Sequence, residues 1–263
     1  MLVIFKHELR QNYKSMLIWS LSVGLMGMFC ICLYSSMTED MAALSDSFSN
    51  MGAFSDAFGM STLGIGTIAG YFATEVGVVH SLGSSMFAAV TATTILSKEE
   101  DGHTGEFLYS LPISRGQVVI AKILAVLTMI IVFTIITIAC YLPGFAYIDA
   151  YPEWDLFAIF MASQFVMNVE IMLICIAISA FLKRNLTGAG LGIALLLYAF
   201  DLTGRITEEM KAYLPIEPFS YCNASEIFAK VETNMSAYIW AVVIMIVAAA
   251  LAFKKYTNKD LAA

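Results

Sequence analysis

Apolar runs of about 20 residues recur along the chain, and this is the length that a helix needs to cross the hydrocarbon core of a bilayer. Only 13% of the 263 residues are charged, whereas a soluble domain carries about a quarter. Because lipid offers no hydrogen-bond partners to the backbone, each run is expected to be helical. The sequence therefore predicts an all-α membrane protein with six transmembrane helices. We place them at about residues 16–35, 77–97, 117–142, 156–182, 186–202 and 237–253.

Three parts of this pattern are irregular. The second apolar run begins at about residue 61, so its glycine-rich part before residue 77 is expected to be an outer extension or a bent half-helix. Pro143-Gly144 is expected to end the third span. The apolar residues of the outer segment, 203–236, are too scattered for a span and favour short helices or a re-entrant element.

The basic residues set the orientation of the spans. Of the 14 Lys and Arg residues, only Arg205, Lys211 and Lys230 would lie on the outer side if the chain starts inside. The positive-inside rule then places both termini and the loop between spans 2 and 3 in the cytoplasm.

Residues 1–14 form a short amphipathic pattern before the first span. Leu2, Phe5, Leu9 and Tyr13 recur at spacings of three and four, with charged residues between them. This spacing predicts a helix that lies in the cytoplasmic interface. The alternative is that the segment is only the charged flank of the first span. The remaining residues, 15–263, make up the six-helix transmembrane domain.

Ionisable residues within spans are costly and usually face the bundle or a cavity. Glu170, near the middle of the fourth span, is the candidate for lining a transport pathway or ordering a helix interface. The alternative is a structural hydrogen bond to a neighbouring helix. Glu75 and His80 lie on different faces, and Asp201 fits an interfacial cap. No metal site or catalytic set can be assembled from the sequence.

The loop at 98–116 is the most patterned polar segment. It begins with Glu99, Glu100 and Asp101, and Asp101-Gly102 predicts a turn. Thr104 can then cap a helix of about two turns. The helix would present one apolar face and end at Pro112, and a Ser114–Gln117 capping box would start the third span. The apolar face consists of Phe107, Leu108 and Leu111. It would either enter a groove of a partner protein or lie on the membrane surface.

The string EEDGHTGEFLYSLPISRGQVVIAKIL, from Glu99 to Leu124, resembles the cytoplasmic loop of ABC-2 family permeases, the membrane subunits of type V ABC exporters. The residues that carry the resemblance are Glu99, Glu100, Gly102, Thr104, Leu108, Leu111, Pro112, Ile113, Ser114, Arg115 and Lys122. The resemblance implies that the loop is a coupling helix docked in a groove of a separate ATPase. It thereby implies ATPase contacts for Glu99, Glu100, Gly102, Thr104, Phe107, Leu108, Leu111, Pro112 and Arg115.

The resemblance also implies that two permeases, identical or different, work with two ATPase subunits, which bind the ATP and Mg²⁺. The chain agrees with this division, because it contains no GxxxxGK[ST] phosphate loop and no LSGGQ-like signature. A net charge of −7 without a basic cluster argues against nucleic-acid binding.

The sequence thus favours a permease subunit in a bacterial plasma membrane, itself not an enzyme, that exports a hydrophobic or amphipathic substrate such as an antimicrobial peptide. The alternative is a membrane scaffold or sensor that recruits a cytoplasmic regulator without transport. Whether the chain binds an ATPase distinguishes these two hypotheses.

Overall fold

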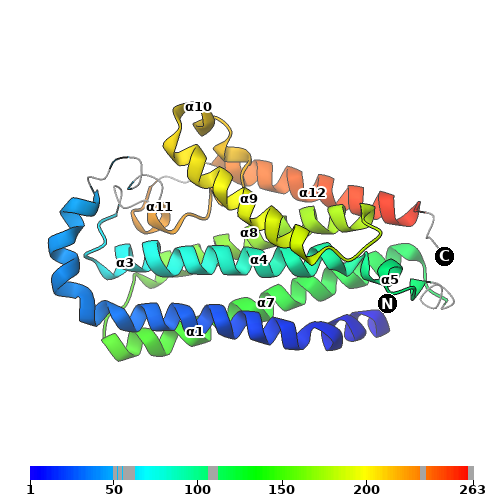
Figure 1. The fold of residues 1–263 in the computed structure, drawn as a ribbon, viewed down its shortest axis with the longest axis horizontal. Helices are drawn as coiled ribbons and strands as arrows, with labels where there is room; N and C mark the ends of the chain where they lie inside the picture. The colour runs from blue at the N-terminus through cyan, green and yellow to red at the C-terminus, as the bar shows by residue number, and fades with distance from the viewer. Residues whose placement is uncertain (50–51, 53–54, 56–62, 106–111, 232–234, 260–263) are drawn as a thin grey trace.

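A computed structural model of the chain describes residues 1–49, 52, 55, 63–105, 112–231 and 235–259. Its long helices run side by side, and both chain termini lie at one end, called here the terminal end (Figure 1). Six helical stretches are long and apolar enough to cross a membrane: Leu2–Ser36, Ile68–Ile95, Arg115–Ile148, Trp154–Phe181, Thr187–Ile206 and Met235–Thr257. The predicted all-α fold with six spans is confirmed.

The elements follow one another as a series of long helices with short helical turns between them. In order they are α1 (Leu2–Ser49), α3 (Ile68–Tyr71), a π-helical turn (Phe72–Val76), α4 (Gly77–Ile95), α5 (Lys98–Asp101), α7 (Arg115–Ile148), α8 (Trp154–Phe181), α9 (Thr187–Ile206), α10 (Glu208–Lys211), a 3₁₀ turn (Leu214–Ile216), α11 (Ala224–Phe228) and α12 (Met235–Thr257). Short helices were one of the two expectations for residues 203–236.

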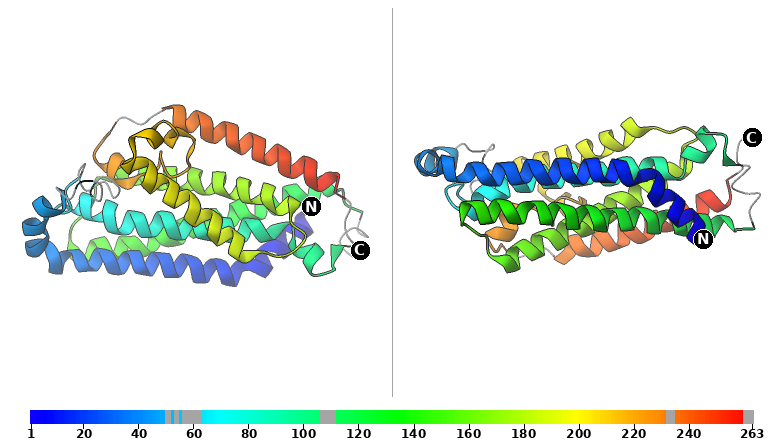
Figure 2. Two further views of the ribbon diagram at one scale, coloured as in Figure 1. Left: turned by 45° about the horizontal axis from the view of Figure 1, so that its top comes forward. Right: turned by 90° about the horizontal axis from the view of Figure 1, so that it is seen from below.

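The predicted N-terminal helix is the beginning of α1 and is continuous with the first span. Its first turns bend away from the rest of α1 (Figure 2, right). Ile4 and Glu8 are buried, whereas Leu2 and Tyr13 are exposed, so the face turned to the bundle is rotated from the one that the apolar spacing predicts. Its placement in a membrane interface stays a prediction.

The prediction that Pro143 ends the third span is wrong, because α7 continues to Ile148. A proline within a helix removes one backbone hydrogen bond, which packing against neighbouring helices can offset. Pro143 is itself exposed, while Gly144 lies against α1 and Phe145 is fully buried. The helix ends instead at Asp149, whose φ of 47° is left-handed.

The extension of the second span is helical from Ile68 onward and anchors an aromatic cluster at the end opposite the termini. Phe72, in the π-helical turn, is fully buried. Its ring centroid lies 5.5–6.2 Å from five other rings, which come from α7, α8 and α11. These are Tyr141, Phe145, Phe157, Phe160 and Phe228. The cluster ties four segments together far from the loop at 98–116.

Gly190 explains how closely α9 approaches α4. A Cβ added there would lie 2.8 Å from both the Ala89 carbonyl oxygen and the Val90 Cα, whereas one added at Gly192 would meet nothing within 4 Å. Gly190→Ala is therefore expected to destabilise the fold by about 1–3 kcal/mol, the usual cost of overpacking. Gly192→Ala, the matched control, is expected to be neutral or slightly stabilising, since Ala favours helix. Thermal unfolding in detergent would measure both, and equal effects would contradict the close approach.

Candidate functional site

The segment that joins α4 to α7 lies at the terminal end and begins with a tight turn. The Gly102 N–H donates to the Lys98 carbonyl at 2.9 Å, and the Thr104 N–H donates to the Glu99 carbonyl at 2.9 Å. His103 between them has a left-handed φ of 51°. The turn predicted at Asp101-Gly102 is therefore present.

The predicted coupling residues separate into three groups. Phe107, Leu108 and Leu111 lie outside the described residues, so the short helix predicted for them stays a prediction. Gly102, Thr104 and Pro112 are exposed. Glu99, Glu100 and Arg115 instead contact other parts of this chain. The capping box is confirmed: the Gln117 N–H donates to Ser114 Oγ at 3.3 Å, and the Ser114 N–H donates to Gln117 Oε1 at 3.2 Å.

Two lysines and two glutamates from three helices meet beside this turn. We call Glu8, Lys98, Glu99 and Lys122 the charge cluster. Lys122 of α7 is fully buried, and its Nζ pairs with Glu99, lies 3.2 Å from Glu8 Oε1 and donates to the Ile95 carbonyl at 2.5 Å. Lys98 pairs with Glu8 of α1 and donates to Gln11 Oε1 at 2.5 Å. The cluster therefore joins α1, α5 and α7.

The charges within the cluster balance, which explains how it tolerates burial. Burial lowers the pKa of Lys98, while the negative charge of Glu8 opposes that shift. Removing one partner of a buried pair leaves an uncompensated charge and costs far more than the pair contributes to stability. The cluster thus restricts relative movement of its three helices.

A second set of contacts fixes the loop to the chain after α12. We call Glu100, Arg115 and Lys259 the tail clamp. Lys259 Nζ lies 2.6 Å from Glu100 Oε1 and donates to the Leu182 carbonyl at 2.7 Å. Arg115 donates through Nη1 to the Thr257 carbonyl at 3.3 Å and to the carbonyl of Lys259. Both ends of the loop are therefore held, one by Glu100 and the other by Arg115.

Glu170 lies fully buried on α8. Its Oε2 accepts a hydrogen bond of 2.7 Å from the Tyr221 hydroxyl, which belongs to the segment before α11. Six residues earlier on α8, Gln164 Nε2 donates to Ser81 Oγ at 2.7 Å and to the Cys222 carbonyl at 2.9 Å. The hydrogen bond considered as the alternative for Glu170 is present, although to this segment and not to a long helix. A role in a pathway stays a prediction.

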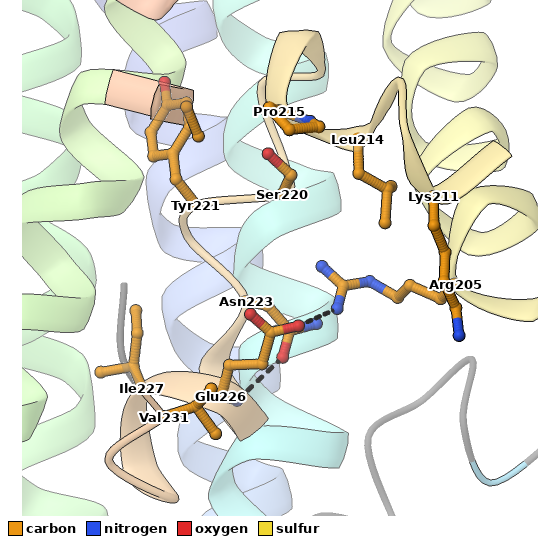
Figure 3. A pocket seen from close by; sticks show the side chains of 11 residues that line it. Arg205, Lys211, Leu214, Pro215, Ser220, Tyr221, Asn223, Glu226, Ile227 and Val231 are labelled. Atoms are coloured by element: carbon orange, nitrogen blue, oxygen red, sulfur yellow. Dashed lines mark hydrogen bonds and ion pairs between the residues drawn. The ribbon is translucent and has the colours of Figure 1, made fainter. Parts of the chain in front are cut away.

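The outer segment also encloses a cavity of about 190 Å³ near α9 (Figure 3). Arg205 lies on its wall and pairs with Glu226 of α11 and, at 2.9 Å, with Asp201 Oδ2 on its own helix. Asp201 therefore forms an ion pair with a largely buried guanidinium, in addition to the capping role that was expected.

Glu75 and His80 of the second span face different sides, as predicted. Glu75 is exposed, whereas His80 is buried with its Nδ1 2.9 Å from the Tyr141 hydroxyl.

Glu217, in the same outer segment, is expected to make the stability of the fold depend on pH. Burial raises the pKa of Glu217, and the negative charge of Asp201 raises it further. The folded protein then holds this proton more tightly than the unfolded chain, so stability is expected to fall as pH rises above the unfolded value of about 4.3. Glu217→Gln should flatten this decline, and thermal unfolding across that pH range would measure it. Glu208→Gln, at an exposed position, is the control, and equal slopes in the two variants would contradict the assignment.

The chain was compared with models of known protein families. The model of the ABC-2 family transporter protein matches residues 2–261, which is almost the whole chain. The chain belongs to this family. A comparison with curated proteins found no match. The family resemblance inferred from the loop is confirmed, and this ABC-2 transporter protein is a multi-pass membrane protein whose six apolar helices fit a permease subunit.

Sequence reasoning about this ABC-2 protein missed three members of the site. Glu8, Lys98 and Lys259 were not singled out, although each makes a buried or partly buried ion pair. Glu8 carried a weak signal, because it lies three residues after Phe5 and next to Leu9, at the edge of the apolar face. Lys98 and Lys259 carried no signal beyond their position at a helix end, where basic residues are common.

Proposed function

We propose that this ABC-2 protein is the permease subunit of an ATP-driven exporter and that the loop at 98–116 couples it to a separate ATPase. The loop then faces the cytoplasm, as do both termini. A pair of ATPase subunits binds the ATP and Mg²⁺, and a second permease, identical or different, completes the translocation unit.

The observation that carries this proposal is that both ends of the loop are bound to the spans by charged groups. Glu99 is paired with Lys122 of α7, which also lies 3.2 Å from Glu8 of α1. Glu100, at the same end of the loop, and Arg115, at the other end, hold the end of α12 and the residues that follow it. A partner that displaces the loop, whose Gly102, Thr104 and Pro112 are exposed, therefore pulls on three helices at once. A loop that only reversed the chain would need none of these contacts.

The substrate class is part of the proposal. A hydrophobic or amphipathic molecule such as an antimicrobial peptide is the expected cargo, moved outward. Its support is the resemblance of the chain to exporter permeases. Glu170, a buried acid in the middle of α8, is the candidate pathway residue.

Purification of the tagged chain in mild detergent, followed by mass spectrometry and an ATPase assay, tests the proposal. A nucleotide-binding subunit should copurify in stoichiometric amount, and it should be lost from a variant with Phe107, Leu108 and Leu111 all replaced by Ser. A variant with Lys183→Gln and Arg184→Gln, in another loop, should keep it. A parent chain that purifies alone, or with a regulator and no ATPase, would favour the scaffold or sensor instead.

A further inference from the structure

Two cavities meet in a groove between α8 and α12. The first, of about 390 Å³, is lined mainly by aliphatic residues of both helices, including Ala177, Val247 and Ala248. The second, of about 330 Å³, is lined by Phe181, Leu251, Lys254, Lys255 and Asn258. Phe181 and Leu251 line both, so the two cavities lie next to each other, and together they are called here the α8–α12 groove.

The α8–α12 groove changes character along its length. Every described residue that lines the first cavity is apolar. The described lining of the second includes two lysines and an asparagine amide and no acidic side chain. Lys255 Nζ lies 5.0 Å from the centroid of the Phe181 ring, which holds its ammonium at the boundary between the two parts. Among the described residues neither Lys254 nor Lys255 forms an ion pair, so the described lining of the basic end carries net positive charge.

We infer that the α8–α12 groove binds an anionic phospholipid, with an acyl chain between the helices and the phosphate at Lys254 and Lys255. A shallow apolar groove with a basic end matches the two chemical parts of such a lipid. Basic pockets between transmembrane helices on the cytoplasmic side bind anionic headgroups in this way. The Asn258 amide can donate a further hydrogen bond to the headgroup. This inference does not depend on ATPase coupling.

A second copy of the chain fits the groove less well. In a two-fold symmetric contact the same patch meets itself. Both copies cross the bilayer in the same direction, so the axis runs along the membrane normal and the two Lys254–Lys255 pairs would face each other. Like charges at close range disfavour that contact, whereas an anionic headgroup neutralises them.

Lipid retention tests the inference. The purified protein would be reconstituted in equal amounts of phosphatidylglycerol and phosphatidylcholine and then re-extracted in mild detergent. The lipid that stays bound would be measured by mass spectrometry. The parent should retain phosphatidylglycerol in excess, and K254Q/K255Q should lower that excess by about tenfold. K183Q/R184Q, which removes the same charge from residues that line neither cavity, should leave it unchanged.

A second variant probes the apolar part of the groove without changing charge. Val247 is half exposed and lines the first cavity, so V247W should fill the groove without disturbing the core. V247W should reduce the amount of retained phosphatidylglycerol several-fold. If the lysine variant does not fold, this reduction alone tests the inference. Equal losses in K254Q/K255Q and K183Q/R184Q would overturn the inference in favour of diffuse surface charge. Disulfide-linked dimers of a V247C variant in membranes would overturn it in favour of a second copy.

Discussion

Replacing Lys122 with Met is expected to destabilise the folded protein by about 3–5 kcal/mol, the cost of removing one partner from a buried ion pair. Lys122 is fully buried, and its ammonium is shared between Glu8 and Glu99. Without it, two carboxylates remain beside the single charge of Lys98. Met keeps the length and most of the volume of the side chain, so the loss reports on charge. Thermal unfolding in detergent, monitored as the fraction of protein that stays monodisperse, would measure this loss of stability.

Two further variants separate charge from general damage. Lys211→Met breaks an ion pair with Glu208 that is largely exposed, and such pairs contribute about 0.2–1 kcal/mol. Combining Glu8→Gln with Lys122→Met restores the balance of charge within the cluster, so the double variant should be more stable than Lys122→Met alone. If Lys122→Met unfolds no more readily than Lys211→Met, the ammonium does not hold the cluster together.

The spans were predictable because crossing a bilayer constrains sequence length and polarity directly. The apolar run at 156–182 matches α8 (Trp154–Phe181) to within two residues. The capping box at the start of α7 was also predictable. Ser114 and Gln117 are three residues apart, so they can cap a helix without contacts from the rest of the chain.

The departures arise where distant segments decide the outcome. The α7 helix passes Pro143 because Gly144 and Phe145 pack against other parts of the chain. Likewise, Gly188, Gly190 and Gly192 look equivalent in sequence, yet among these three only Gly190 meets another backbone. Such differences depend on which face of a helix meets a neighbour, and spacing alone leaves that open.

In the candidate site, some features were predictable from the sequence and others depend on contacts between distant segments. The family resemblance pointed to Glu99, Glu100 and Arg115 as residues that face an ATPase, and that role stays a prediction. Their partners within the chain lie 23 to 159 residues away in the sequence. Nothing in the local sequence indicates that Glu100 forms an ion pair with Lys259. The two roles are compatible, because a residue that transmits a push from a partner must itself be attached to the spans.

That attachment leads to the second large effect, which rests on the proposed function. Lys259→Met removes the cation beside Glu100 and the hydrogen bond to the Leu182 carbonyl, so movement of the loop reaches the end of α12 only through the backbone contacts of Arg115. Substrate transported per ATP hydrolysed is expected to fall by at least about fivefold, the lower range of coupling energies between sites. Reconstituted vesicles that contain the permease and its ATPase would measure transport and hydrolysis together.

Loss of stability could lower transport by itself, and a double variant distinguishes the two causes. Lys259→Met leaves Glu100 as a buried charge without its partner, whereas adding Glu100→Gln removes that charge. The double variant should therefore recover stability towards that of the parent while transport per ATP stays low, because the ionic contact is still missing. Recovery of both would mean that the tail clamp only stabilises the fold. A Lys259→Met variant that transports as the parent does would show that movement reaches the spans by another route. The remaining connections are the backbone contacts of Arg115 and the charge cluster of Glu8, Lys98, Glu99 and Lys122.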